Sequence, residues 1–300
     1  MEFKKYNSIV NHYDNKSISR LLYTNPGAED IQYEITEKID GANFAVYIGA
    51  DGSHSFARRN GMIGEDDNFM KCYVATEAMP LEYIKTELRR MFDNLDIVLY
   101  GELFGKGILG RINYGQGRYL RFYDLVINGI MQPPHVIRDV FHAIGQAEYL
   151  VPLLGYAKSF QEAIDWDVEI ASTEFDDKME GIVIKPTTVL YNKEGGRFII
   201  KKKSEAFMET RCKKLNRTKV EATLRQIEFA NYITESRLIS VISKEGEPES
   251  PSDIGKYIKL LIDDAIEEFT NGELPDNNDG SLRKYGGRFA AQLIKERMGA

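Results

Sequence analysis

The sequence predicts an α+β fold in which largely antiparallel sheets are followed by a small all-helical region. Segments rich in β-branched and aromatic residues fill the first two thirds of the chain, and helical patterns interrupt them without a regular β–α–β alternation. Asp40-Gly41 supplies turn chemistry between the first two strand patterns. We expect strands at 31–38, 42–48, 97–104, 119–127, 182–185 and 198–202, and helices at about 79–92, 135–148 and 158–166.

The last third of the chain has a different character. Apolar residues from Ile254 to Phe269 recur at three- and four-residue steps, which is typical of one buried helix face. Ser252 and Asp253 are candidates for the N-cap of this helix. Helical patterns also occupy 224–243 and 281–298, so we expect a first domain at 1–220 and a helical domain at 221–300.

Composition sets the broad class of the protein. The 300 residues are 43% hydrophobic and 28% charged, as in an ordinary globular protein with a real core. No run of about 18 apolar residues suggests a membrane span, and the first residues, MEFKKYNSIVNHYDNK, lack the apolar stretch of a secretory signal. Cys72 and Cys212 form no C-x-x-C pair, so we expect a cytoplasmic protein without disulfides or a cysteine–histidine zinc site.

The charge of the chain is unevenly distributed. The formal net charge is −7, which argues mildly against nucleic-acid binding. Residues 197–225, however, are strongly basic and could neutralise phosphates, although charge alone favours a solvated helix face or linker.

Five short motifs carry the chemistry. Lys38-Ile39-Asp40-Gly41 is a K-x-D-G motif, and a lone lysine at a strand end is usually only a surface cation. The ordered set that follows gives it weight, because each member places charged or aromatic side chains at the end of a strand pattern. The set comprises GELFG at 101–105, FYD at 122–124, EGIVIK at 180–185 and KKK at 201–203.

This order of motifs resembles the covalent nucleotidyltransferases, the superfamily of ATP-dependent DNA ligases, RNA ligases and mRNA capping enzymes. Within it, the chain resembles the RNA ligase 2 family, which includes phage double-stranded RNA ligases and trypanosome RNA-editing ligases. FKKYNSIVNHY at 3–13, VPLLG at 151–155 and VISKEG at 241–246 share this likeness. It covers nearly the whole chain and implies an ATP-grasp-like adenylyltransferase domain at 1–220, followed by the helical domain.

The resemblance also implies a reaction. Lys38 would attack the α-phosphorus of ATP to form lysine–AMP and release pyrophosphate, with Mg²⁺ or Mn²⁺ assisting. The AMP would move to a 5′-phosphate, and a 3′-hydroxyl would then seal the strand. The expected substrate is a nick in duplex RNA or in an RNA–DNA hybrid, and the enzyme is expected to be a monomer. A lysine attacks only as the neutral amine, so nearby cations such as Lys201 and Lys203, with the metal, should lower its pKa.

The other site residues follow from the family likeness. Glu102 would hold the ribose hydroxyl or a metal-bound water, and Glu180 would bind the catalytic metal, as suits a hard cation. Tyr123 would stack on adenine. Without the resemblance, Glu102 and Glu180 would be interpreted as exposed carboxylates at strand ends, and Tyr123 as a residue of the core. Lys185, Lys201 and Lys203 would contact phosphate, with Lys202 facing away because strand side chains alternate.

Further roles are implied near the nucleotide. Arg59, with Arg58 as the competing choice, would lie near the nucleotide and the terminal ribose. Asn43 would touch metal-bound water, and Glu37 would read adenine mainly through its backbone. Asp40 and Asp124 are supporting residues: phage relatives can carry histidine in place of Asp40, and Asp124 would orient a lysine or a metal-bound water. Candidate RNA contacts in the helical domain are Arg225, Arg237, Arg283 and Lys284.

Three alternatives stay open at this point. A GTP-dependent capping enzyme or a DNA ligase would share the lysine chemistry but normally ends in an OB-fold. A catalytically inactive RNA-end-binding protein would share the fold only. The glycines at 101–117 favour a mobile loop after a site strand over a phosphate-binding loop.

Overall fold

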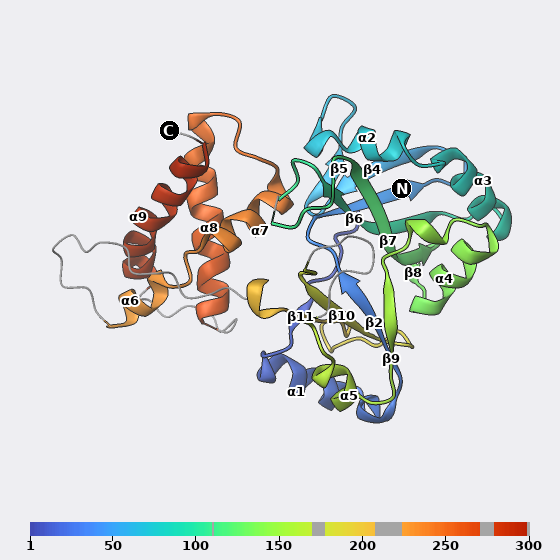
Figure 1. Cartoon of the computed structure of the whole chain (residues 1–300), viewed down its shortest axis with the longest axis horizontal. Helices are drawn as coiled ribbons and strands as arrows, with labels where there is room; N and C mark the ends of the chain where they lie inside the picture. The colour runs from blue at the N-terminus through green and yellow to red at the C-terminus, as the bar shows by residue number, and fades with distance from the viewer. Residues whose placement is uncertain (110, 170–177, 208–223, 271–278, 299–300) are drawn as a thin grey trace. The chain divides into compact units, whose positions relative to one another are not determined.

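The computed structural model describes residues 1–109, 111–169, 178–207, 224–270 and 279–298 (Figure 1). The chain divides into two compact units, Met1–Ala206 and Phe207–Ala300. The boundary expected near 220 falls within 208–223, which lies outside the described residues. Among the described residues, no helix has the length and apolar composition needed to cross a membrane.

The first unit contains a five-stranded sheet. Its strands pair in the order β1 (Val10–Asn11), β11 (Ile200–Lys203), β10 (Gly181–Pro186), β2 (Tyr33–Lys38) and β9 (Leu153–Ala157). All neighbours are antiparallel except β1 and β11. Helices α1 (Asn15–Thr24) and α5 (Phe160–Asp165) pack their apolar side chains on one face of this sheet, in a buried cluster that includes Ile35, Ile182 and Ile200.

A second sheet in the same unit has six strands. The order is β5 (Gly61–Ile63), β4 (His54–Arg58), β3 (Ala42–Ile48), β6 (Ile97–Gly105), β7 (Arg118–Ile127) and β8 (Ile130–Met131), with every pair antiparallel. The turn at Asp40-Gly41 therefore does not close a hairpin. It carries the chain from β2 of one sheet to β3 of the other, which places Lys38 where the two sheets meet.

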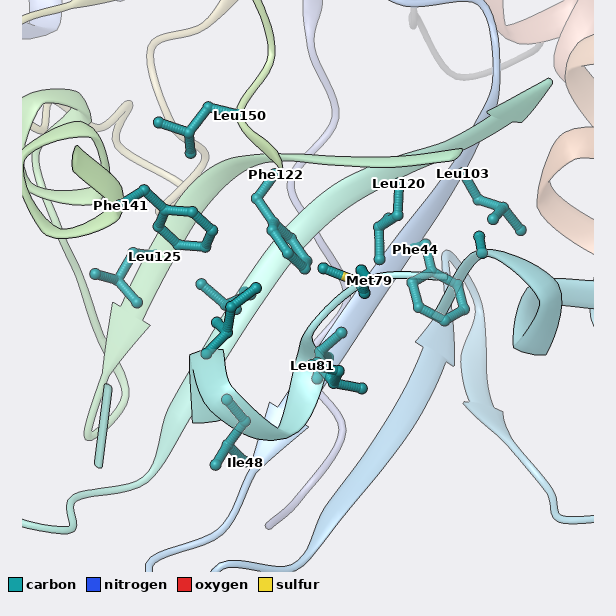
Figure 2. Packing of buried hydrophobic residues seen from close by; sticks show 14 of the residues in the cluster. Phe44, Ile48, Met79, Leu81, Leu103, Leu120, Phe122, Leu125, Phe141 and Leu150 are labelled. Atoms are coloured by element: carbon teal, nitrogen blue, oxygen red, sulfur yellow. The ribbon is translucent and has the colours of Figure 1, made fainter. Parts of the chain in front are cut away.

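The largest core lies on one face of the six-stranded sheet. Helices α2 (Cys72–Glu77), α3 (Leu81–Met91) and α4 (Pro134–Ala143) cover this face with buried side chains such as Ile84 and Phe141. Figure 2 shows Phe44, Leu103, Leu120, Phe122, Leu125 and Phe141 gathered in this cluster. The opposite face turns toward the five-stranded sheet: Tyr47, Val98 and Tyr100 of the six-stranded sheet share a second cluster with Val183 of β10.

The second unit is helical in its described residues. It contains α6 (Leu224–Ala230), α7 (Glu235–Glu245), α8 (Ile254–Phe269) and α9 (Asp279–Met298). The single helix expected at 224–243 is interrupted, because the Thr234 hydroxyl accepts from the Arg237 N–H and starts a new helix. Arg237 then pairs with Asp264 and Glu268 of α8.

The start of α8 corrects one expectation. Ser252 and Asp253 are not its side-chain caps, since the Asp253 carboxylate instead accepts from the Ser250 N–H at 2.9 Å in a capping box around a short 3₁₀ turn. The predicted α+β class, with antiparallel sheets before a helical region, is confirmed. Short 3₁₀ segments complete the described elements: Ala28–Asp30, Phe69–Lys71, Ala147–Tyr149, Glu205–Phe207 and Pro251–Asp253.

Candidate active site

Lys38 lies at the end of β2 and its amine contacts a carboxylate from a neighbouring strand. Lys38 Nζ donates to Glu180 Oε2, and Glu180 directly precedes β10. Gly181 is the register partner of Lys38 on one side and of Lys203 on the other. A Cβ atom at Gly181 would collide with the carbonyl oxygen of Lys202, so glycine permits the close approach that brings the two lysines into one row.

Glu180 is the centre of a charge cluster. Its second oxygen, Oε1, lies 3.3 Å from Lys203 Nζ and 3.7 Å from Arg111 Nη2. Burial alone would raise the pKa of this carboxyl group, but the neighbouring charges of Lys38, Lys203 and Arg111 outweigh it and lower the pKa to about 2. Glu180 is therefore an anion at neutral pH.

The same contacts set the charge of Lys38. Burial would lower the pKa of its amine, but Glu180, Glu102 and Asp40 act more strongly in the opposite direction, and the pKa is raised. This is the reverse of the shift that we expected for a nucleophile surrounded by cations. In the protein alone, Lys38 is an ammonium group held by carboxylates.

Side-chain alternation explains why Lys202 and Lys203 of β11 lie on opposite faces of the sheet. Lys202 Nζ donates to the carbonyl oxygens of Ile164 and Trp166, at 2.7 and 2.9 Å, on the face that carries α5. Lys203, one residue on, points to the other face and reaches Glu180. Lys201 has the same strand parity as Lys203 and is paired in register with Val183.

The six-stranded sheet contributes Asn43 and Glu102, which are register partners on β3 and β6. Asn43 Nδ2 donates to the hydroxyl oxygen of Tyr123. Burial, together with the negative charges of Glu180 and Asp40, raises the pKa of Glu102 to about 8. Within the described part of the chain, the Glu102 carboxyl group has no hydrogen bond or ion pair, and the charges of Lys38 and Arg59 offset the shift only in part. Its carboxyl group is thus suited to receive a cation.

A β-bulge brings Tyr123 and Asp124 to the same face of β7. Asp124 is the register partner of Tyr100, whereas Phe122 is the partner of Gly101, so Tyr123 is an extra residue. The alternation resets there: Phe122 and Leu125 belong to the large core, while Tyr123 and Asp124 face the five-stranded sheet. A regular strand would have placed these two side chains on opposite faces.

Asp124 joins the two sheets through a buried charge cluster. Lys185 Nζ lies 3.0 Å from one of its oxygens, and Arg197 Nη1 lies 2.7 Å from the other, which also accepts from the Tyr6 hydroxyl. Lys185 Nζ also donates to the Tyr123 carbonyl at 2.8 Å and lies 5.1 Å from the centre of its ring. Lys185 is 2% exposed, so the structure gives it a holding role, and its phosphate contact stays a prediction.

The two candidate arginines lie differently. Arg58 pairs with Asp67 at 3.0 Å and covers the ring of Phe69. Arg59 donates to Ser8 Oγ at 3.2 Å and is close enough to Glu102 and Tyr123 for its charge to act on the pKa of each. The geometry therefore favours Arg59 as the arginine of the site.

Glu37 is buried on β2, immediately before Lys38. Its N–H donates to Pro152 O at 3.0 Å. A backbone contact from Glu37 to adenine would therefore be made by its carbonyl oxygen, and this contact stays a prediction.

Three site residues were missed by the sequence reasoning. Arg111 binds Asp40 through both carboxylate oxygens, and the Tyr114 hydroxyl accepts from the Asp40 N–H at 2.8 Å. Both lie in the segment interpreted as a mobile loop. Arg197, assigned only to a basic run, is buried against Asp124. The available signal was the K-x-D-G aspartate itself, because a buried carboxylate requires a cationic partner from elsewhere.

The carboxylates fit a hard divalent cation. Among the described residues, no group of three or more histidine, cysteine or acidic side chains is arranged to hold a metal alone. Mg²⁺, however, is usually bound by one or two carboxylates together with substrate phosphates. Glu102 and Glu180 could fill that role, because both are carboxylates beside Lys38, and burial and the charges of Glu180 and Asp40 raise the pKa of Glu102 despite Lys38 and Arg59.

Comparison with known proteins agrees with this geometry. The family model described as RNA ligase matches residues 31–203, and the model described as T4 RNA ligase 2 C-terminal matches residues 216–282. The first spans β2 to β11 and therefore every motif of the site.

Solved structures of a Naegleria gruberi RNA ligase have a similar fold. A variant with AMP and Mn is 19% identical with a TM-score of 0.52, covering 70% of this chain and 58% of that one. A variant with ATP and Mn is 18% identical, with a TM-score of 0.52 and coverage of 70% and 59%. The ligase with PPi is 19% identical, with a TM-score of 0.51 and coverage of 69% and 57%. The present chain thus spans less than two thirds of these ligases.

The family models account for both the strand-borne motifs and the helical region after them, in the order in which they occur along the chain. The chain therefore belongs to the RNA ligase family, as a member of its RNA ligase 2 branch within the nucleotidyltransferase superfamily.

Proposed function

We propose that the protein is an ATP-dependent RNA ligase that joins a 3′-hydroxyl to a 5′-phosphate at nicks in duplex RNA or in an RNA–DNA hybrid. The observation that carries this proposal is the contact of Lys38 with Glu180. Lys38 and Lys203 are the register partners of Gly181 on its two sides, so both lysines lie beside Glu180. We further propose that it acts as a monomer in the cytoplasm, in keeping with the free, buried Cys72.

The protein's own residues would prepare Lys38 for attack on the α-phosphorus of ATP. The amine must lose a proton, and the carboxylates that raise its pKa oppose this until their charge is neutralised. Mg²⁺, when bound, supplies that neutralisation and stabilises charge on the phosphates. Lys203 and Lys201 would remain as cations for the phosphate oxygens, since phosphoryl transfer depends mainly on positioning and electrostatic stabilisation.

Recognition of the nucleotide is proposed for the residues of the six-stranded sheet. Tyr123 would present its ring to adenine, with Asn43 holding its hydroxyl, while Glu102 would meet the ribose or a metal-bound water. Arg59 would lie toward the terminal ribose. The AMP would then pass from Lys38 to the 5′-phosphate, and attack by the 3′-hydroxyl would release it.

The helical unit offers fewer RNA contacts than its basic residues suggest. Arg237 is 2% exposed and paired with Asp264 and Glu268, so it is a structural residue of that unit and not a surface contact. Arg225 and Lys284 are exposed, and Arg283 is paired with Asp263 at the surface. These three are the remaining candidates for RNA phosphates.

Incubation with α-labelled ATP and Mg²⁺ tests the proposal. The expected result is an acid-labile protein–AMP adduct that is absent from Lys38→Ala and retained by the matched surface variant Lys158→Ala. The labelled protein should then seal a nicked RNA duplex. An adduct that persists in Lys38→Ala would show that another residue is the nucleophile.

The same assay separates the alternatives. Labelling by GTP and not by ATP would indicate a capping enzyme, and no label from either would indicate an RNA-end-binding protein. The described residues after 207 form helices and contain no strand, unlike the five-stranded barrel of an OB-fold, which disfavours both the capping enzyme and the DNA ligase. Sealing of nicked DNA in preference to nicked RNA would nevertheless restore the DNA ligase.

A further inference from the structure

The loop between β6 and β7 is fixed to the turn that follows Lys38. Its described residues are 106–109 and 111–117. The Tyr114 ring is buried and packs edge-on against Phe104, with ring centres 4.8 Å apart. Its hydroxyl accepts from the Asp40 N–H at 2.8 Å. One part of the loop is therefore bonded to the main chain two residues after the nucleophile.

The backbone before Arg111 is also constrained. Leu109 has a φ of 56°, a left-handed conformation that L-residues with large side chains rarely adopt. Its side chain packs against the main core, and Ile108 and Ile112 are buried. Such a conformation persists only where the surrounding packing holds it, and it is most often found at functional sites.

Arg111 uses this placement to bind Asp40. Arg111 Nε donates to Asp40 Oδ2 at 3.0 Å, and Nη2 contacts Oδ1. Asp40 is 1% exposed. A guanidinium that binds both oxygens of a carboxylate forms one of the stronger and more directional contacts in proteins, and a buried carboxylate without such a partner is costly.

Three carboxylates act on the amine of Lys38, those of Glu180, Glu102 and Asp40, and Arg111 binds Asp40 through both oxygens. Asp40 is held by Arg111, while Glu180 contacts Lys38 and lies 3.7 Å from Arg111 Nη2. Without the guanidinium, Asp40 would compete for the ammonium group of Lys38. It would also repel Glu180, because the two negative charges are close enough for Glu180 to raise the pKa of Asp40.

We propose that Arg111 is a positioning residue for Lys38: by holding Asp40, it leaves Glu180 as the carboxylate that orients the attacking amine. The inference rests on the proposed function, since it concerns the lysine that would be adenylylated. In this role, Arg111 acts through Asp40.

A double-mutant cycle tests this role. The variants are Arg111→Gln, Asp40→Asn and the pair together, and the measurement is single-turnover formation of the labelled Lys38 adduct over a range of ATP concentrations. Arg111→Gln should lower the maximal rate about 10- to 100-fold, as loss of an outer partner commonly does. The ATP concentration at half-maximal rate should change little, because substrate binding is not the affected step.

The double variant gives the sharper result. If Arg111 acts through Asp40, the pair should be no slower than the slower single variant. Its melting temperature should exceed that of Arg111→Gln, because position 40 no longer carries a buried carboxylate without its partner. The second readout does not depend on activity, so a loss of fold in Arg111→Gln would be recognised as such.

Two further variants separate geometry from charge. Arg111→Lys keeps the charge but cannot bind both oxygens of Asp40 from one planar group, and should stay slow. Arg90→Ala removes an exposed arginine paired with Glu87 at 2.7 Å and should keep the wild-type rate.

Several outcomes would overturn the inference. Rate losses that multiply in the double variant would mean that Arg111 contacts the nucleotide directly, as would a raised half-saturating ATP concentration with an unchanged maximal rate. Wild-type kinetics in Arg111→Gln would show that Arg111 does not position Lys38, without contradicting the proposed function. If the wild-type protein were never labelled, both the positioning role and the proposed function would be wrong.

Discussion

The amine of Lys38 and the carboxyl group of Glu102 both have raised pKa values, so the lysine stays charged and the glutamate becomes neutral. Carboxylates raise the pKa of the lysine and keep it protonated, while burial and the neighbouring acids raise the pKa of Glu102 to about 8. Without a bound metal, Lys38 is therefore an ammonium group and Glu102 a protonated carboxyl group at neutral pH. A bound divalent cation would lower the pKa of both groups.

The pKa of Glu102 predicts how the stability of the metal-free protein depends on pH. Between about 4.5 and about 8, the unfolded chain loses the Glu102 proton while the folded protein keeps it, so stability falls as pH rises. Glu102→Gln has no titrating group at this position, so its stability does not fall in this way. In EDTA, the free energy of unfolding of Glu102→Gln minus that of wild type should therefore increase by at least about 2 kcal/mol from about pH 5 to about pH 8.

Urea denaturation at a series of pH values measures this difference. Glu65→Gln, at an exposed carboxylate, is the matched control and should follow the wild-type curve. If the difference between Glu102→Gln and wild type stayed flat across this range, Glu102 would be ionised in the folded protein and the account of its environment would be wrong.

At the scale of the element, the contact between β10 and β7 is the next one to test. Lys185 reaches across from the five-stranded sheet to Asp124 of the six-stranded sheet, inside the protein. Lys185→Met should lower the free energy of unfolding by about 3 kcal/mol, because it breaks a buried ion pair while Arg197 still holds Asp124.

Thermal and urea unfolding would show this loss, with the exposed Lys193→Met as control. The alternative role, contact with a phosphate, has a different signature. Unchanged stability with weaker ATP binding in Lys185→Met would restore that role.

Local sequence patterns found the strands but not their partners. Residues 42–48 form β3 as predicted, and 97–104 extends by one residue in β6. Alternation and β-branched content are local properties, so they cannot show that β2 and β3 belong to different sheets. The two-residue β1 and β8 are set by pairing alone and carry almost no pattern of their own.

The site was predictable where chemistry follows a strand end. Lys38, Glu180 and Lys203 are brought together as the order of motifs indicated. Arg111 was not predictable in this way, because its position depends on a loop held by packing and on a buried partner distant in sequence. The charge of Lys38 was misjudged for a similar reason: the balance among three acids and several cations is decided by distances, which motifs do not contain.

On the scale of the whole molecule, every residue of the candidate active site lies in the first unit. That unit has its own cores on both sheets. A protein of residues 1–206 should therefore still form the Lys38 adduct with labelled ATP. We expect it to lose the sealing of nicked RNA duplexes, because the candidate phosphate contacts Arg225, Arg283 and Lys284 lie in the helical unit.

Gel assays of adduct formation and of nick sealing, run side by side on the short and full-length proteins, check this division. Lys38→Ala in both lengths gives the background. Sealing by the short protein at the full-length rate would leave the helical unit without a role in the reaction, and failure to form the adduct would show that the first unit depends on the second.

The extra residue in β7 has a consequence for anyone who redesigns or transplants this strand. The side-chain alternation differs on the two sides of the bulge: Leu120 and Phe122 face the core two residues apart, whereas the next core residue, Leu125, follows Phe122 by three. A uniform ten-residue replacement could preserve the interior or the ring-and-carboxylate pair at Tyr123 and Asp124, but not both. Alignments of this strand should therefore be anchored separately on each side of the insertion.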